Sequence, residues 1–300
     1  MSQTMAHGRN QTMTIARHRL PRSAGTARAR ADGAGRAWTG LADALWAEWT
    51  KLRTEPGTAW ILAAICVLTV AVGAATAAAT RCGGGTGCSI DPTKVSLTGI
   101  EAGQAVVAVL AVLVISGEYS TGMIAVTFTA MPRRAAVLAA KAATLTGLVL
   151  AAAVVAVAGS LAAGRLILAG NGITAAHGFA VVSLAHGSTV RAAAGSVLYL
   201  ALVGLLSLGI ATIVRDSAAA TGAVLGMLYV PPVIALFLGS EPAWQRWVER
   251  YTPTNAGLAI LNTTGLRDLV ISPWAGLGVL AAWAAAALLA AGVLLHLRDA

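Results

Sequence analysis

Charge is what this chain has least of. Asp, Glu, Lys and Arg together make up only 11% of its 300 residues, whereas hydrophobic residues make up 57%. A soluble domain needs more charge than this to cover its surface, so the composition indicates lipid as the solvent of most of the chain. A helix crosses a hydrocarbon core of about 30 Å with about 20 apolar residues. The stretches between the few charged residues are therefore the candidate membrane spans.

Lysine is especially rare, and none of the three lysines (51, 94 and 141) follows a phosphate-binding loop. The GGGTG sequence at 83–87 lacks the Lys-Ser/Thr pair and the helix that such a loop requires. No G-x-x-x-x-G-K-[ST] motif occurs elsewhere in the chain. The sequence therefore excludes a P-loop ATPase.

Signatures of catalysis, metal binding and ion coupling are also missing. The five histidines form no H-E-x-x-H motif, none pairs with a cysteine at ligand spacing, and no G-x-S-x-G motif is present. A proton-coupled carrier usually keeps an ionisable group deep in the membrane. Here the charged residues lie at or near the ends of the candidate spans, with Glu101 and Lys141 the nearest to exceptions. We predict a protein that is not an enzyme and carries no metal or cofactor of its own.

What the chain does have is a series of long charge-free stretches, each interrupted by charge at its ends. They are continuously apolar and do not alternate with period two, so helices are favoured over the strands of a membrane barrel. We predict an all-α integral membrane protein, a six-helix transmembrane bundle occupying 59–297. The predicted spans are 60–79, 102–117, 142–164, 192–214, 217–240 and 270–297, the last beginning near Pro273.

A seventh span at 166–190 is the alternative, because this stretch is also free of charge. It contains Asn171, His177, Ser183 and His186 together with several glycines. Placing such groups in lipid without partners costs several kcal/mol each. We therefore interpret 166–190 as an external loop with a short helix leading into the fourth span.

The distribution of basic residues predicts the orientation. Nine of the 21 Lys and Arg residues precede the first span. The positive-inside rule then places the N-terminus in the cytoplasm. With six spans, however, four arginines of the second half fall outside, against the rule: Arg191, Arg246, Arg250 and Arg267.

Two segments precede the first span. Residues 1–37 are rich in Arg, Ala, Gly, Ser and Thr without apolar periodicity, which predicts a disordered basic cytoplasmic tail. Residues 38–54 have an apolar position every three or four residues and end before Pro56-Gly57, which predicts an N-terminal amphipathic interfacial helix. Its apolar face is Trp38, Leu41, Leu45, Trp49 and Leu52, and Glu48, Lys51 and Arg53 lie largely off that face.

A second amphipathic helix is predicted at 243–252. Trp244, Trp247 and Tyr251 share one face, and aromatic rings of this kind favour the headgroup layer. Arginines on a helix that lies along the outer membrane surface have little influence on how the spans insert. Arg246 and Arg250 therefore argue only weakly against a cytoplasmic N-terminus. The charged residues of the other face are Arg246, Glu249 and Arg250.

Cysteine and glycine suggest two further contacts. Cys82 and Cys88 flank the glycine-rich part of the first external loop, where a disulfide is chemically permitted. Gly222 and Gly226 form a G-x-x-x-G pattern in the fifth span, which would allow another helix to approach closely, although a glycine-rich chain also produces such a match by chance.

Three motifs give the chain a resemblance to a known family. E-W-T-K-L-R-T at 48–54, G-E-Y-S-T-G-M at 117–123 followed by P-R-R and V-L-A-A-K, and S-P-W-x-G at 272–276 resemble the permeases of ABC-2 type transporters. The order of parts agrees from residue 38 onward. The resemblance implies the membrane half of a bacterial ATP-driven exporter in the plasma membrane, working as a homodimer or with a related permease.

In that family a separate P-loop ATPase subunit holds ATP and Mg, and the elbow after the second span docks on it. The resemblance implies that the elbow contacts here are Glu118, Tyr119, Ser120, Thr121, Arg133 and Arg134. It adds Glu48, Lys51 and Arg53 of the interfacial helix as secondary contacts. The charge-poor spans suit a hydrophobic or amphipathic cargo.

The alternative function is a membrane anchor or regulatory protein that transports nothing and docks a soluble partner through the 117–134 loop. An intramembrane enzyme is a third class, disfavoured because no nucleophile and base are evident. Neither composition nor motifs indicate nucleic-acid binding.

Overall fold

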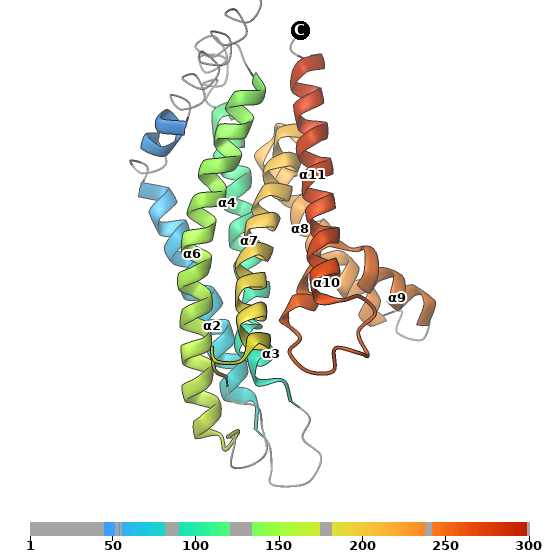
Figure 1. Ribbon diagram of the computed structural model, residues 1–300. Helices are drawn as coiled ribbons and strands as arrows, with labels where there is room; N and C mark the ends of the chain where they lie inside the picture. Colours follow the sequence, from blue (N-terminus) through green and yellow to red (C-terminus); the bar gives the residue numbers. More distant parts are fainter. Residues whose placement is uncertain are drawn as a thin grey trace, which may run out of the picture. The chain divides into compact units, whose positions relative to one another are not determined.

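A computed structural model describes residues 45–51, 54, 56–81, 90–120, 134–174, 182–237 and 242–298 (Figure 1). These residues form helices joined by short turns, with no strand among them, so the all-α prediction is confirmed. They all belong to one compact unit, Leu41–Ala300. The predicted tail at 1–37 lies outside the described residues.

Six of the described helices are long and apolar enough to cross a membrane, and the six-span prediction is confirmed. The stretch at 166–190 is not a seventh span, since its beginning is the end of one helix and its last residues start the next. The six helices are α2 (Pro56–Ala79), α4 (Ile100–Ser120), α6 (Arg134–Gly170), α7 (Gly187–Val214), α8 (Ser217–Phe237) and α11 (Pro273–Arg298).

Shorter helices occupy two of the connections. Helix α3 (Pro92–Leu97) leads directly into α4, and its first turn is capped by Asp91. Between α8 and α11 lie α9 (Pro242–Tyr251), α10 (Pro253–Leu258) and the 3₁₀ turn η2 (Ala259–Leu261). Residues 45–51 are helical as well, which agrees with the helix predicted at 38–54 over the part described.

Helices α2, α4, α6 and α7 extend beyond the charge-free stretches that predicted them. Helix α6 has 37 residues, or about 55 Å, against a hydrocarbon core of about 30 Å. Lys141 and Arg165, which bound the predicted third span, are both helical. The helix continues past both charges because neither residue breaks helical backbone.

Helix α7 is the centre of the bundle. It packs against α4, α6 and α11, and it is the most buried of the six long helices. Its inward residues include Tyr199, Leu200 and Leu206, all almost completely buried. Helices α2, α8 and α11 are mostly exposed and form the outside of the bundle. Their apolar surfaces are therefore available to lipid or to another subunit.

Candidate functional site

Four segments lie at the same end of the bundle as the last turn of α11, and we name it the Lys141 end. They are the helix at 45–51, the last turn of α4, the first turns of α6 and the turn between α7 and α8 (Figure 1). The predicted orientation places this end in the cytoplasm, because the elbow between the second and third spans lies here. This end therefore carries the described part of the predicted docking elbow, and docking there stays a prediction.

A buried ion pair joins two of these segments. The Lys141 ammonium of α6 lies 2.9 Å from Oε2 and 3.0 Å from Oε1 of Glu48. The Lys141 side chain is 1% exposed and that of Glu48 is 10% exposed. Hydrogen bonds between ionised groups are stronger than neutral ones, and water competes poorly at this depth. The pair therefore fixes the helix at 45–51 against α6.

This pair changes the place of Glu48 in the site. The family resemblance predicts Glu48 as a contact with an ATPase, but its carboxylate is turned into the bundle, on Lys141. Trp46 and Trp49, by contrast, are 74% and 42% exposed. The sequence marks Lys141 only as a charge at the start of an apolar span, a position that a lysine at the membrane surface can also occupy. It does not say which carboxylate supplies a counter-charge, since Lys141 and Glu48 are 93 positions apart.

Tyr119 connects the end of α4 to the turn between α7 and α8. The Arg215 guanidinium carbon lies 5.4 Å from the centroid of the Tyr119 ring, a cation–π contact. Arg215 ends α7 with a φ of 63°. Asp216 then begins α8 by accepting a hydrogen bond of 2.7 Å from the backbone N–H of Ala219. Tyr119, one of the predicted elbow residues, therefore contacts the turn that joins α7 to α8.

The remaining predicted residues are described only in part. Helix α4 continues through Ser120, so the segment at 117–120 is its last turn and the elbow begins later than predicted. Glu118 and Ser120 are helical in α4, and Arg134 begins α6. Lys51 is helical and half-buried. The positions outside the described residues are Arg53, Cys82, Cys88, Thr121 and Arg133.

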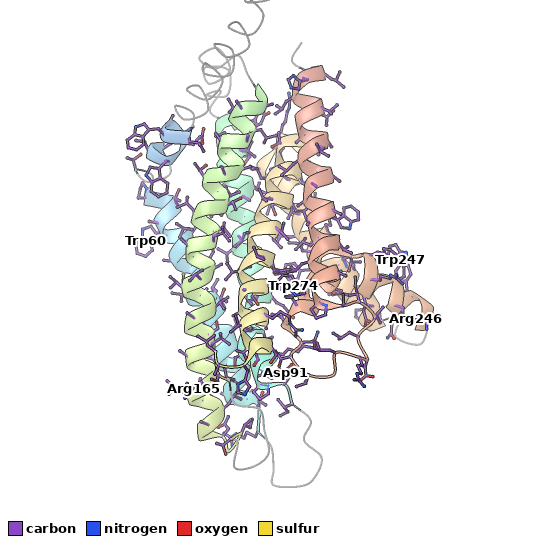
Figure 2. All side chains as sticks on the ribbon, in the orientation of Figure 1. Trp60, Asp91, Arg165, Arg246, Trp247 and Trp274 are labelled. Carbon is purple, nitrogen blue, oxygen red and sulfur yellow. The ribbon has the colours of Figure 1, made fainter. Side chains whose placement is uncertain are left out.

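The opposite end of the bundle, which we name the Asp91 end, is held by a carboxylate clamp (Figure 2). Asp91 accepts hydrogen bonds from the backbone N–H of Thr263 at 2.6 Å and of Thr264 at 3.1 Å, and from the Thr263 hydroxyl at 2.6 Å. Arg191 of α7 donates to the carbonyl of Asn262 at 2.6 Å. The segment at 262–264 is therefore tied to both α3 and α7.

A polar layer lies next to this clamp. The Tyr199 hydroxyl donates to the side-chain oxygen of Gln104, and the Tyr229 hydroxyl donates to the backbone carbonyl of Glu101. Glu101 also lines a pocket of about 300 Å³ together with Lys94 and Glu249. Acidic and basic groups are mixed in this pocket, so its charge selects no one kind of ion.

Helix α9 has the aromatic face that the sequence predicts. The Trp244 and Trp247 rings stack with centroids 5.2 Å apart, and Trp247 and Tyr251 follow at 6.0 Å. The Trp283 indole N–H of α11 donates to the Tyr251 carbonyl at 3.0 Å, which ties α9 to the last span. Trp247 and Arg246 are labelled in Figure 2. That α9 lies in the headgroup layer stays a prediction.

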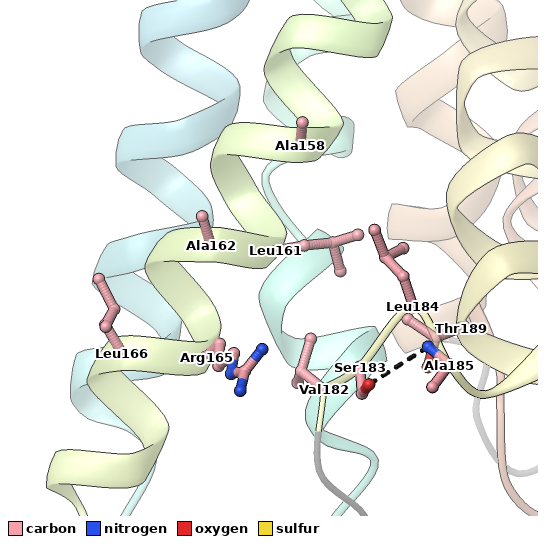
Figure 3. A pocket seen from close by; sticks show the side chains of 10 residues that line it. All are labelled: Ala158, Leu161, Ala162, Arg165, Leu166, Val182, Ser183, Leu184, Ala185 and Thr189. Atoms are coloured by element: carbon pink, nitrogen blue, oxygen red, sulfur yellow. Dashed lines mark hydrogen bonds between the residues drawn. The ribbon is translucent and has the colours of Figure 1, made fainter.

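A cavity of about 710 Å³ lies between α6 and the segment at 182–189 (Figure 3). Most of its lining is aliphatic, and Arg165 is its one charged lining residue among those described. Within the part of the chain that the structure describes, no group of three His, Cys, Asp or Glu side chains could hold a metal ion.

Comparison with known families and proteins adds no name to this geometry. No family model matches the chain, and a comparison with curated proteins finds no match either. The membrane bundle thus rests on the structure, and the ABC-2 resemblance rests on the sequence motifs.

Proposed function

We propose that this chain is the permease subunit of an ATP-driven exporter of the ABC-2 type. In this proposal a separate P-loop ATPase binds at the Lys141 end, and the chain supplies the membrane pathway for a hydrophobic or amphipathic substrate. The N-terminus is cytoplasmic, and two permease subunits form one pathway in a bacterial plasma membrane.

The Glu48–Lys141 pair is the observation that best supports this proposal. The helix at 45–51 and the start of α6 are the two segments that an ATPase would contact, and the pair makes them one unit. A partner that pushes on either segment therefore moves α6, the longest span. Coupling of this kind needs a rigid element whose position differs in free energy between two states of the bundle.

A second contact extends the same connection. Tyr119 and Arg215 tie the end of α4 to the α7–α8 turn. Movement of the elbow would then reach α7, which contacts α4, α6 and α11. The exposed Trp46 and Trp49, with Trp60 at the start of α2, provide indole rings suited to the headgroup layer around this docking surface.

The proposal is tested through the elbow residues Glu118 and Arg134. We expect the double substitution Glu118→Gln and Arg134→Gln to lower permease-dependent ATP hydrolysis by about tenfold, a coupling free energy of about 1.4 kcal/mol. The measurement compares the ATPase subunit with and without the permease in lipid vesicles. The matched control is Glu249→Gln with Arg246→Gln on α9, which should change nothing.

Assembly of the two subunits is measured on the same samples. Unchanged hydrolysis with intact assembly would count against transport and favour an anchor or regulatory protein. Failure to find any P-loop ATPase that co-purifies with the chain would remove the basis of the proposal.

Helix α8 offers a face for the second subunit. A side chain at Gly222 or at Gly226 would meet open space within 4 Å, so neither glycine is used for packing within the chain. Helix α8 is also the least buried of the six spans. Close approach of a second α8 through this pattern would give the dimer a tight helix contact.

We expect Gly222→Leu with Gly226→Leu to weaken dimerisation by tenfold or more, which is about 1.4 kcal/mol. Light scattering of the purified protein across a concentration series measures the dimer fraction. Gly147→Leu and Gly278→Leu are the matched controls, because both glycines are also exposed helical positions with open space around them. Equal dimer fractions in all variants would exclude this face of α8.

A further inference from the structure

The cavity beside α6 has two walls of different origin. One wall is a single face of α6, with small or aliphatic residues at helical spacing (Figure 3). The other wall is the segment that enters α7. Leu161 and Leu184 approach each other from the two walls in Figure 3. The lining residues are Ala158, Leu161, Ala162, Arg165, Leu166, Val182, Ser183, Leu184, Ala185 and Thr189.

Arg165 gives this apolar cavity one charged end. Its guanidinium extends from α6 toward Val182 in Figure 3. None of the described lining residues is acidic. The two lining hydroxyls are already engaged, since Ser183 Oγ accepts from the backbone N–H of Ala185 at 3.2 Å and Thr189 shares a hydrogen bond of 3.4 Å with Thr93. The Arg165 guanidinium is therefore the polar group of this site that is available to bind a ligand, and it is a cation.

Helix length places this charge at a membrane boundary. Lys141 and Arg165 are 165 − 141 = 24 positions apart on α6, which corresponds to about 36 Å of helix. A hydrocarbon core is about 30 Å thick, so the two charges reach opposite headgroup layers. Ala158 lies seven positions before Arg165 and hence about 10 Å deeper, at the level of acyl chains.

We propose that this cavity binds one anionic phospholipid from the leaflet at the Asp91 end. Its phosphate lies on the Arg165 guanidinium, whose planar fork suits phosphate oxygens. One acyl chain lies between the two apolar walls, over Ala158, Ala162 and Leu184. Basic pockets between membrane helices are a recognised kind of site for acidic lipid headgroups.

The size and lining of the cavity decide between a lipid and a free anion. A volume of about 710 Å³ lies within the range of ligand pockets and exceeds the needs of a phosphate ion. A hydrated ion that enters an aliphatic cavity loses water and gains no hydrogen bonds in return. An acyl chain that enters the same cavity is stabilised, because its apolar surface is removed from water. The bilayer supplies such a chain next to the site.

The test measures lipid retention by the full-length protein in native mass spectrometry, after delipidation and addition of either phosphatidylglycerol or phosphatidylcholine. We expect bound phosphatidylglycerol to exceed phosphatidylcholine, and Arg165→Gln to reduce phosphatidylglycerol retention by about tenfold. Arg165→Lys should retain an intermediate amount, because it keeps the charge and loses the fork. Arg246→Gln, an exposed arginine on α9, is the matched control and should retain as much as the parent protein.

A second variant tests the apolar wall. Ala162→Trp fills the cavity from an exposed position and should reduce retention while Arg165 is intact. The proposal is overturned if Arg165→Gln binds phosphatidylglycerol as the parent does, or if the two lipids are retained equally. It is also overturned if inorganic phosphate displaces phosphatidylglycerol at matched concentration, which would identify a free-anion site.

Discussion

Replacing Glu48 with leucine should lower the free energy of unfolding by about 3–5 kcal/mol, the usual cost of removing one member of a buried ion pair. The side chain left behind is Lys141, which is 1% exposed and sits on a core helix. Denaturation of the purified protein in mixed micelles, followed by circular dichroism, measures the change.

The reciprocal substitution should cost less. Lys141→Met leaves Glu48 unpaired, but Glu48 belongs to a segment whose tryptophans are largely exposed. That segment can shift and return the carboxylate to water. We therefore expect Lys141→Met to lose roughly half as much free energy as Glu48→Leu. The double variant should lie within about 1 kcal/mol of the parent, because two apolar side chains of similar size replace the pair.

Two exposed charges serve as controls for this series. Glu249→Leu on α9 and Lys94→Met on α3 remove the same groups from exposed positions, and each should change the free energy of unfolding by less than about 0.5 kcal/mol. The double-mutant cycle gives the coupling energy of the pair directly. A coupling energy near zero would mean that Glu48 and Lys141 are not paired in the membrane.

The spans could be predicted because placing a charged side chain in lipid is energetically unfavourable. Each of the six predicted spans is occupied by a long helix, and Pro273 begins α11, as a residue without a backbone N–H can at a helix start. The helix ends could not be predicted in the same way. Helix α6 continues past Lys141 and Arg165, because a charged side chain limits the lipid-buried part of a helix but does not break its backbone.

Contacts between distant segments could not be predicted. Glu48 and Lys141 are each compatible with a surface position, and only the packing of the helix at 45–51 on α6 brings them together. Asp91 and Thr263 are 172 positions apart, and no periodicity connects them. The aromatic face of α9 could be predicted, because it depends only on spacing within one helix.

The segment after α9 shows a further limit. The sequence predicts no helix or strand at 253–269, yet Ile260 and Leu261 are almost completely buried. Helix α10 and the turn η2 pack against α7 and α11. Helix α10 and the turn η2 are too short for a repeating pattern of apolar residues to reveal them in the sequence. They are buried because the neighbouring span α11 approaches them closely.

Gly276 is the residue that allows this approach, and it is the last residue of the S-P-W-x-G motif. A Cβ added at Gly276 would lie 1.9 Å from the backbone carbonyl oxygen of Ala256 in α10 and 3.4 Å from the Cβ of Ala259. Real Cβ atoms do not come so close to backbone. Accommodating even a methyl group would therefore require α10 and α11 to separate. The glycine of this motif therefore has a packing role that does not depend on the proposed transport function.

We expect Gly276→Ala to lower the free energy of unfolding by about 3 kcal/mol, the upper part of the range for an overpacked core. Gly278→Ala is the matched control, two residues along the same helix, where a Cβ would meet nothing within 4 Å. It should raise stability by up to about 1 kcal/mol, because alanine favours helix over glycine. If the two substitutions change the free energy of unfolding in opposite directions in the same micelle denaturation, the α10–α11 contact is established. A Gly276→Ala protein as stable as its parent would show that α10 does not pack on the start of α11.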